Sequence, residues 1–199
     1  GFFQSHPYVD ILAHGEGEIT FANILRERLR ENPNYAHVRG ITYNQNKKSM
    51  RMQPQPRATE KGMDKNGNPT PLIEDIISPY LFDTFEELMR AHPELGFNAT
   101  SETHRGCPYS CEFCDWGSAT YQHVDKFPDE RVMAEYGWIA EHKIGFVYNA
   151  DANYLLFPRD EELNRGLIRL NQRTGFPKQL RANWAKNSQE RIFNAAKEL

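Results

Sequence analysis

The alternation of apolar and polar positions predicts two groups of elements on either side of a proline-rich stretch. In the first group, a short buried strand over 8–13 leads through a glycine-rich turn into a helix with apolar positions at Ile19 and Leu25. Segments 38–43 and 49–52 then predict a hairpin. A strand, a glycine-rich turn and a helix in this order are typical of a doubly wound α/β sheet.

The middle of the chain has a different character. Residues 54–79 hold five of the twelve prolines and show no hydrophobic periodicity, which predicts a linker. A short helix is expected over 84–91, because Pro93 ends the pattern.

From about Phe97 the pattern predicts three successive β/α units. The expected strands and helices alternate along the chain: strand 97–103, helix 128–143, strand 144–148, helix 159–174, strand 180–184, and a helix that begins near Asn187. Asp129 and Glu130 in the first turn suit the dipole of the first helix, and Gly175 lies just past the second. Such units predict a parallel sheet that curls into a barrel, with catalytic groups in the loops after the strands.

Composition narrows the class of protein. Of 199 residues, 39% are hydrophobic and 26% charged, which is enough for a packed core. A net charge of −3 gives no general basic field, so no nucleic-acid partner is expected.

No apolar run approaches the roughly 18 residues of a membrane span, and no secretory signal follows Gly1. The expectation is a cytoplasmic protein without membrane contact. Because the chain starts without methionine and a helix pattern runs into Leu199, an internal segment of a longer protein is expected.

All three cysteines lie within eight residues, as Cys107-x3-Cys111-x2-Cys114. An odd, clustered set is a poor disulfide framework, and clustered thiols more often hold a metal. Three thiolates can each bind one iron of a 4Fe–4S cube, where four are usual, and so leave one iron open. Gly106 before the first cysteine permits a backbone turn that other residues resist.

Zinc is the competing interpretation of the same cysteines. His104 or His123 would complete a Cys3His site in a non-catalytic binding module. Zinc ribbons usually bring two separated Cys-x2-Cys pairs, however, and this chain has one. Three incidental buried cysteines are a third interpretation.

The motif Cys-x3-Cys-x-aromatic-Cys resembles the signature of the radical S-adenosylmethionine (SAM) family, with Phe113 in the aromatic place. The resemblance implies that Cys107, Cys111 and Cys114 ligate the 4Fe–4S cluster. It also implies that SAM binds the open iron and that Phe113 packs near the adenine.

A second motif, 148–154, follows the second of the three strands. By resemblance, the end of this strand contacts the SAM amino group, and Asp151 and Asn153 stand where the family often has Gly-Gly-Glu. The alternative interpretation is a polar helix cap or an ordinary turn. Arg181 and Asn183 share a strand face by the two-residue period and suggest a barrel lining. Lys186 follows them and fits either a site or a solvated loop.

The segment Val9-Asp-Ile-Leu-Ala-His-Gly-Glu-Gly-Glu18 resembles the last strand and turn of the cobalamin-binding domain in the cobalamin-dependent branch of this family. A glycine turn before a helix is the simpler explanation, and His14 is expected to be a turn residue. The resemblance implies an α/β chain: 1–53 ends a Rossmann-like cobalamin-binding domain, 54–96 is a linker, and 97–199 is the first half of a TIM-like radical SAM barrel.

The expected function follows from that resemblance. It implies an enzyme whose reduced cluster cleaves SAM to start carbon-radical chemistry, and a cobalamin-dependent methyltransferase or a related transformation. The implied cofactors are the 4Fe–4S cluster, SAM and, in the full-length protein, cobalamin. The implied partners are a small-molecule or peptide substrate and an electron donor such as flavodoxin or ferredoxin.

Overall fold

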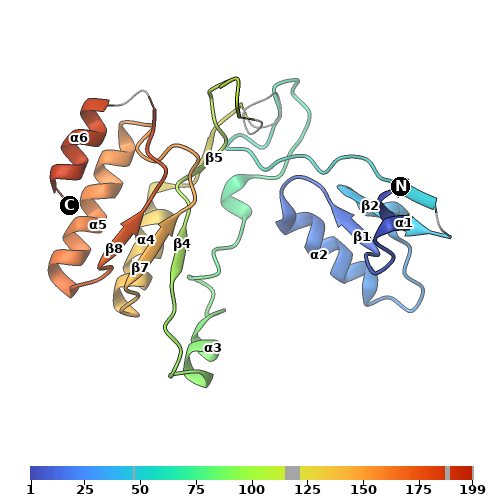
Figure 1. The fold of residues 1–199 in the computed structure, drawn as a ribbon, viewed down its shortest axis with the longest axis horizontal. Helices are drawn as coiled ribbons and strands as arrows, with labels where there is room; N and C mark the ends of the chain where they lie inside the picture. Colours follow the sequence, from blue (N-terminus) through green and yellow to red (C-terminus); the bar gives the residue numbers. More distant parts are fainter. Residues whose placement is uncertain (47, 115–121, 187–188, 199) are drawn as a thin grey trace. The chain divides into compact units, whose positions relative to one another are not determined.

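The computed structural model describes residues 1–46, 48–114, 122–186 and 189–198. The chain divides into two compact units, Gly1–Leu72 and Ile73–Leu199, here called the N-terminal and C-terminal units (Figure 1). No helix of the described part has the length and apolar character needed to cross a membrane.

The N-terminal unit is built on a three-stranded antiparallel sheet in the order β1-β2-β3. Its elements in chain order are α1 (Phe2–Ser5), β1 (Ile11–Ala13), α2 (Gly17–Arg28), the 3-10 helix η1 (Tyr35–His37), β2 (Ile41–Gln45) and β3 (Lys48–Arg51). The buried side chains of Val38, Ile41 and Tyr43 form its core, against partly buried Ile11 and Ile24. The predicted hairpin is confirmed, because β2 and β3 pair antiparallel.

The first strand is arranged differently from the expectation of a doubly wound sheet. Among the described residues, β1 pairs only with β2, and antiparallel. The Rossmann-like assignment of 1–53 therefore remains a prediction. Glu16 of the glycine-rich turn accepts hydrogen bonds from the Arg57 side chain at 2.9 Å and the Ala58 N–H at 3.2 Å, which fixes the turn to the chain that follows the hairpin.

The proline-rich stretch has little regular structure, and its assignment as a linker remains a prediction. Isolated bridges join Thr59 to Leu72 and Met63 to Pro69, and the 3-10 helix η2 (Ile73–Asp75) follows. The predicted short helix is present as α3 (Glu86–Ala91).

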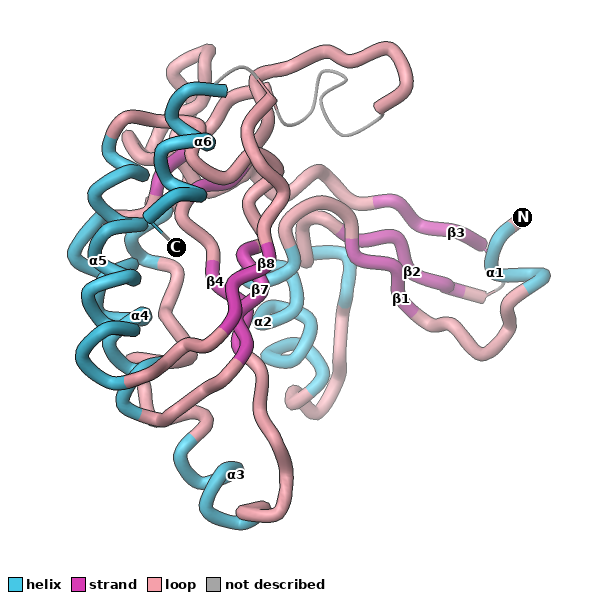
Figure 2. Tube along the Cα trace, turned by 60° about the vertical axis from the view of Figure 1, so that its left-hand side comes forward, coloured by secondary structure: helices cyan, strands magenta, loops and turns pink. Residues whose placement is uncertain are grey.

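The C-terminal unit contains a parallel sheet in the order β4-β7-β8. Its strands are β4 (Ala99–Ser101), β7 (Phe146–Asn149) and β8 (Gln179–Arg181), and its helices are α4 (Asp129–Glu141), α5 (Arg159–Thr174) and α6 (Gln189–Glu198). Figure 2 shows the three helices together on one side of the strands. Three parallel strands alternating with helices confirm the predicted β/α units; closure of a barrel remains a prediction.

Apolar periodicity explains how the helices pack on the sheet. Val132, Tyr136 and Ile139 recur on one face of α4 and are buried. Burial of an aliphatic side chain such as Val132 or Ile139 contributes about 1.5–3 kcal/mol. Gly175 ends α5 with φ 79°, a left-handed conformation that glycine adopts without strain. Asn187, expected near the start of the last helix, lies outside the described residues.

Two short strands were not predicted. β5 (His104–Arg105) pairs antiparallel with β6 (Asp125–Lys126), and the cysteine loop leaves from β5 and returns at β6. This ladder closes the base of the loop directly after the first parallel strand.

Candidate functional site: the cysteine loop and the ends of the parallel strands

The cysteine loop leaves β5 through a backbone turn at Gly106, whose φ of 113° lies in the region that side chains disfavour. Cys107 follows and is 4% exposed, whereas Cys111 and Cys114 are half-buried. The Cys114 N–H donates to the Cys111 carbonyl at 3.0 Å, which forms a turn between these two cysteines. All three are free thiols. Within the described residues, no three His, Cys, Asp or Glu side chains are gathered to hold a metal ion.

Asn153 reaches the first cysteine from the loop after β7. Its Nδ2 donates to the Cys107 Sγ at 3.1 Å, and the Asn153 side chain is completely buried. Its Oδ1 is also buried and has no hydrogen-bond partner among the described residues. Because buried polar atoms are normally paired, this acceptor beside Cys107 is a candidate contact for a donor from a ligand.

Asp151 lies two residues earlier and is engaged with the first strand. Its Oδ1 accepts from the Thr103 N–H at 2.7 Å and the His104 N–H at 3.2 Å, and its Oδ2 accepts from the Thr103 hydroxyl at 2.5 Å. The carboxylate therefore fixes the end of β4 and the start of β5, immediately before the cysteine loop.

Arg159, at the start of α5, also binds the end of the first parallel strand, through the Thr103 carbonyl. It donates to the Thr103 carbonyl at 2.7 Å and to the Phe127 carbonyl at 2.6 Å, and it pairs with Asp129 of α4. Both backbone polar groups of Thr103 are thus bonded by side chains of the second β/α unit. The sequence did not indicate the roles of Thr103 and Arg159, because a contact between residues that are 56 positions apart leaves no periodic pattern in the sequence.

Lys186 lies against the cysteine loop from beyond β8. Its Nζ is 3.4 Å from the Cys111 Sγ, and 5.8 and 6.0 Å from the ring centroids of Tyr109 and Phe113. The hydrogen bond to Cys111 raises the pKa of the Lys186 ammonium, which remains a cation. Lys186 is also exposed, so its assignment to a site remains a prediction.

Comparison with known proteins identifies relatives over almost the whole chain, although no protein-family model matches it. The chain is 41% identical over 198 residues to the cobalamin-dependent radical SAM methyltransferase TokK of Streptomyces tokunonensis. It is 40% identical over 198 residues to the 2-(S-pantetheinyl)-carbapenam-3-carboxylate methyltransferase of Streptantibioticus cattleyicolor. Its homologues are cobalamin-dependent radical SAM methyltransferases. These alignments include 98% of this chain and 27% of each relative, so the chain spans about a quarter of their length.

Solved structures of radical SAM enzymes share the fold. The methyltransferase TsrM from Kitasatospora setae, solved with cobalamin and a [4Fe–4S] cluster, matches with a TM-score of 0.59 at 16% identity, over 98% of this chain and 37% of that one. The cobalamin-dependent radical SAM enzyme OxsB, solved with aqua-cobalamin and SAM, matches with a TM-score of 0.51 at 19% identity, over 99% of this chain and 26% of that one. The fold of this chain is therefore that of an α/β segment of radical SAM enzymes.

The other residues expected from the radical SAM resemblance are placed as follows. Phe113 is 88% exposed, and the Lys186 Nζ lies 6.0 Å from the centre of its ring. Arg181 pairs in register with Tyr148, and the Asn183 Nδ2 donates to the Tyr148 hydroxyl at 3.3 Å. These three lie on one face of the parallel sheet, as the two-residue period predicts. The sequence predicts Tyr148 only as part of an apolar strand and does not indicate that its hydroxyl accepts a hydrogen bond from Asn183.

Neither histidine of the zinc alternative forms a metal site with the thiols in the described residues. His104 is buried, with Nδ1 3.0 Å from the Thr103 hydroxyl and its ring edge against Phe157. The exposed His123 side chain lies 3.3 Å from the Asp125 carboxylate. The radical SAM homologues do not favour the zinc module.

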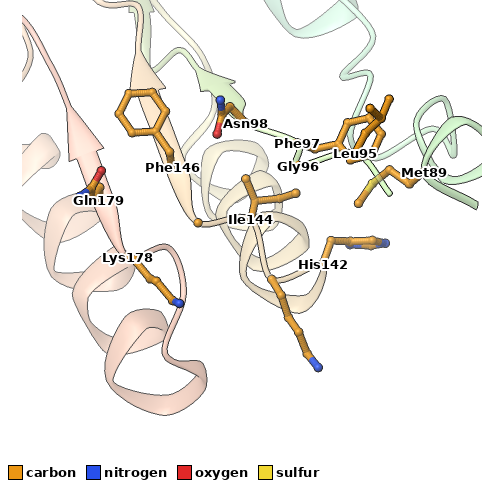
Figure 3. A pocket seen from close by; sticks show the side chains of 12 residues that line it. Met89, Leu95, Gly96, Phe97, Asn98, His142, Ile144, Phe146, Lys178 and Gln179 are labelled. Carbon is orange, nitrogen blue, oxygen red and sulfur yellow. The ribbon is translucent and has the colours of Figure 1, made fainter. Parts of the chain in front are cut away.

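A separate cavity of about 520 Å³ opens at the opposite ends of the strands (Figure 3). Its lining includes Phe97, Asn98, Ile144, Phe146, Lys178 and Gln179, which precede or begin the three strands. None of the predicted site residues lines it. Since radical SAM resemblance and barrel geometry both place the site at the carboxyl ends of the strands, this cavity is not the expected SAM site.

Proposed function

We propose that this chain binds a [4Fe–4S] cluster and SAM as part of a cobalamin-dependent radical SAM enzyme that transfers a methyl group. Cys107, Cys111 and Cys114 are the proposed cluster ligands. When bound, the cluster supplies the electron that cleaves SAM to methionine and a 5′-deoxyadenosyl radical. The chain's own residues supply ligation, orientation and shielding from water.

One observation carries the assignment: the first cysteine is buried against the Asn153 amide, whose oxygen has no hydrogen-bond partner in the part of the chain that the structure describes. A thiolate needs a hydrogen-bond donor when it is buried, and Asn153 Nδ2 provides one to Cys107. The chemistry of the donor set also fits, because three thiolates leave one iron of a cube for SAM. The identity to radical SAM methyltransferases supports the same cofactor.

The role proposed for each side chain depends on whether its oxygen atoms already accept hydrogen bonds within the protein. Asn153 Oδ1 is the proposed acceptor for the SAM ammonium group, since it is buried and unpaired among the described residues. Asp151 is proposed to position the loop, because both of its oxygens already accept hydrogen bonds. Phe113 is proposed to pack against the adenine, which would cover its exposed ring. Arg181 and Asn183 are proposed to line the adjoining sheet face.

The proposal for the whole enzyme extends beyond this chain. We propose that 97–199 is the first half of the radical SAM barrel, that 54–96 is a linker, and that 1–53 ends the cobalamin-binding domain. TsrM has been solved with a tryptophan substrate and a SAM analogue, which makes a small molecule a reasonable substrate class for this enzyme. A low-potential donor such as flavodoxin or ferredoxin is the proposed electron source.

Anaerobic reconstitution with iron and sulfide tests the proposal. The intact protein should take up about four irons and four sulfides, and its reduced form should give the paramagnetic signal of a [4Fe–4S]⁺ cluster that changes when SAM is added. Cys111→Ala should lose the cluster and SAM cleavage, whereas the matched exposed substitution Ser110→Ala should retain both. Tight binding of one zinc ion without a cluster spectrum would refute the proposal and support the zinc module.

A further inference from the structure

Asn153 and Cys107 are joined by a side-chain hydrogen bond that spans 46 residues of sequence. Asn153 lies in the loop after β7, and Cys107 opens the cysteine loop after β5. Cys107 is the most buried of the three cysteines. The bond therefore links the second β/α unit to the ligand that is least accessible to water.

The backbone on the C-terminal side of Asn153 is held firmly. The Tyr154 N–H donates to the Asn183 carbonyl at 2.7 Å, and the Ala185 N–H donates to the Tyr154 carbonyl at 2.9 Å. The Tyr154 side chain is completely buried, and its hydroxyl donates to Asn164 at 3.0 Å. The Asn153 amide is thus presented to the sulfur from a fixed backbone.

The orientation of the amide suits a thiolate. A thiolate sulfur only accepts hydrogen bonds, and the amide nitrogen is the only donor of the Asn153 side chain. Nδ2 therefore faces the Cys107 Sγ, and Oδ1 is directed away from it. An aspartate in this position would bring a negative charge and no donor.

We propose that Asn153 raises the reduction potential of the cluster by donating a hydrogen bond to the Cys107 sulfur; this inference rests on the proposed function. A donor to a ligating sulfur withdraws electron density from it and stabilises the more negative, reduced cluster. Uptake of one electron from a low-potential donor is then easier. In its effect on the potential Asn153 acts through Cys107, which is a positioning role distinct from the SAM contact proposed for its Oδ1.

The midpoint potential of the cluster in the intact, reconstituted protein is the direct test. Asn153→Leu removes the donor at similar size, and Asn153→Asp also adds charge. Both should shift the potential to more negative values, with the larger shift in Asn153→Asp. Asn153→Gln, which keeps a donor, should recover part of the shift.

Asn171 provides the matched control. Its Nδ2 also donates a hydrogen bond, to the Pro177 carbonyl at 2.6 Å, at the far end of α5. Asn171→Leu should leave the potential of the cluster unchanged. A full complement of iron and sulfide with an unchanged potential in both Asn153→Leu and Asn153→Asp would overturn the inference while leaving the proposed function intact.

A measurement on the unaltered protein covers the case in which the Asn153 variants lose the cluster. With ¹⁵N in the asparagine side-chain amides, pulsed electron paramagnetic resonance of the reduced cluster should detect a coupled amide nitrogen. Absence of that coupling would overturn the inference, and its presence would support it. If the unaltered protein forms no [4Fe–4S] cluster, the proposed function and this inference both fail.

Discussion

Asp151 binds Thr103 through both of its carboxylate oxygens, at 2.7 Å to the backbone N–H and 2.5 Å to the side-chain hydroxyl. Both residues are buried. Thr103 lies between the first parallel strand and the cysteine loop, and Asp151 follows the second strand. The pair therefore fixes the start of the loop relative to the sheet.

We predict that Asp151→Ala destabilises the C-terminal unit, because it leaves the N–H groups of Thr103 and His104 without their acceptor and removes one acceptor of the Thr103 hydroxyl. Each unsatisfied buried group costs about 1–3 kcal/mol. Thr103→Val removes only the hydroxyl and should cost about 1–3 kcal/mol. Urea unfolding of the cluster-free protein measures the loss, and tryptophan fluorescence reports on this unit because all three tryptophans lie in it. The exposed substitution Asp75→Ala in the same unit should change stability by less than about 0.5 kcal/mol. Equal stability of Asp151→Ala and the unaltered protein would contradict the prediction.

Arg159 supports a second prediction, because its guanidinium donates to two carbonyls at once, those of Thr103 and Phe127. Arg159→Lys keeps the charge but cannot reproduce this fork, so it should lose about 1–3 kcal/mol in the same unfolding experiment. Arg165 on the same helix, with partly exposed ion pairs to Glu161 and Glu162, is the control. Arg165→Lys should cost less than about 1 kcal/mol. A loss for Arg159→Lys no larger than that for Arg165→Lys would contradict a role for the paired hydrogen bonds of Arg159.

The long helices and the strand order could be predicted from the sequence, because the local sequence signals agree with the packing. The predicted helix 159–174 coincides with α5, since its apolar period, its acidic first turn and Gly175 all indicate the same bounds. The hairpin of β2 and β3 and the parallel order of β4, β7 and β8 were also foreseen. The cysteine spacing identified the candidate site without any structure.

The short strands and the side-chain contacts that connect these elements could not be predicted from the sequence. β5 and β6 have two residues each, which is too short for a periodic pattern. Asp151 was expected to contact SAM, and nothing local indicated that Thr103 would occupy its oxygens. The pairing of Asn153 with Cys107 likewise depends on how two loops meet in space.

Gly40 and Gly15 offer a third prediction, on the N-terminal unit. Both have positive φ, 75° and 77°, so alanine is strained at either position by about 1–2 kcal/mol. A Cβ at Gly40 would also lie 2.7 Å from the Thr20 Oγ1 and 2.9 Å from the Gln55 Cβ, whereas a Cβ at Gly15 meets open space. Gly40→Ala should therefore destabilise the unit by about 1–3 kcal/mol more than Gly15→Ala. Hydrogen exchange of the β2–β3 hairpin measures the difference, and equal effects would contradict the role of the close contact.

Asp160 supports a pH-dependent prediction. Burial raises the pKa of its carboxyl group above 3.8, and Asp151 adds to the rise, while the N–H of Phe157, His104 and Arg159 oppose it. The folded state therefore prefers the protonated form more than the unfolded chain does. The resulting stabilisation is complete below the unfolded pKa and is lost as pH rises through the folded pKa.

We predict that the cluster-free protein loses stability relative to Asp160→Asn as pH rises from about 3.8 to the folded pKa of Asp160, with a constant difference above it. Urea unfolding at a series of pH values, followed by tryptophan fluorescence, measures this difference. Glu162 on the same helix gives a control of opposite sign, because its hydrogen bond from Arg169 lowers its pKa below 4.5. Glu162→Gln should therefore lose stability relative to the unaltered protein only above the folded pKa of Glu162. Parallel profiles for the unaltered protein and Asp160→Asn would show that the Asp160 carboxyl group titrates alike in the folded and unfolded chain.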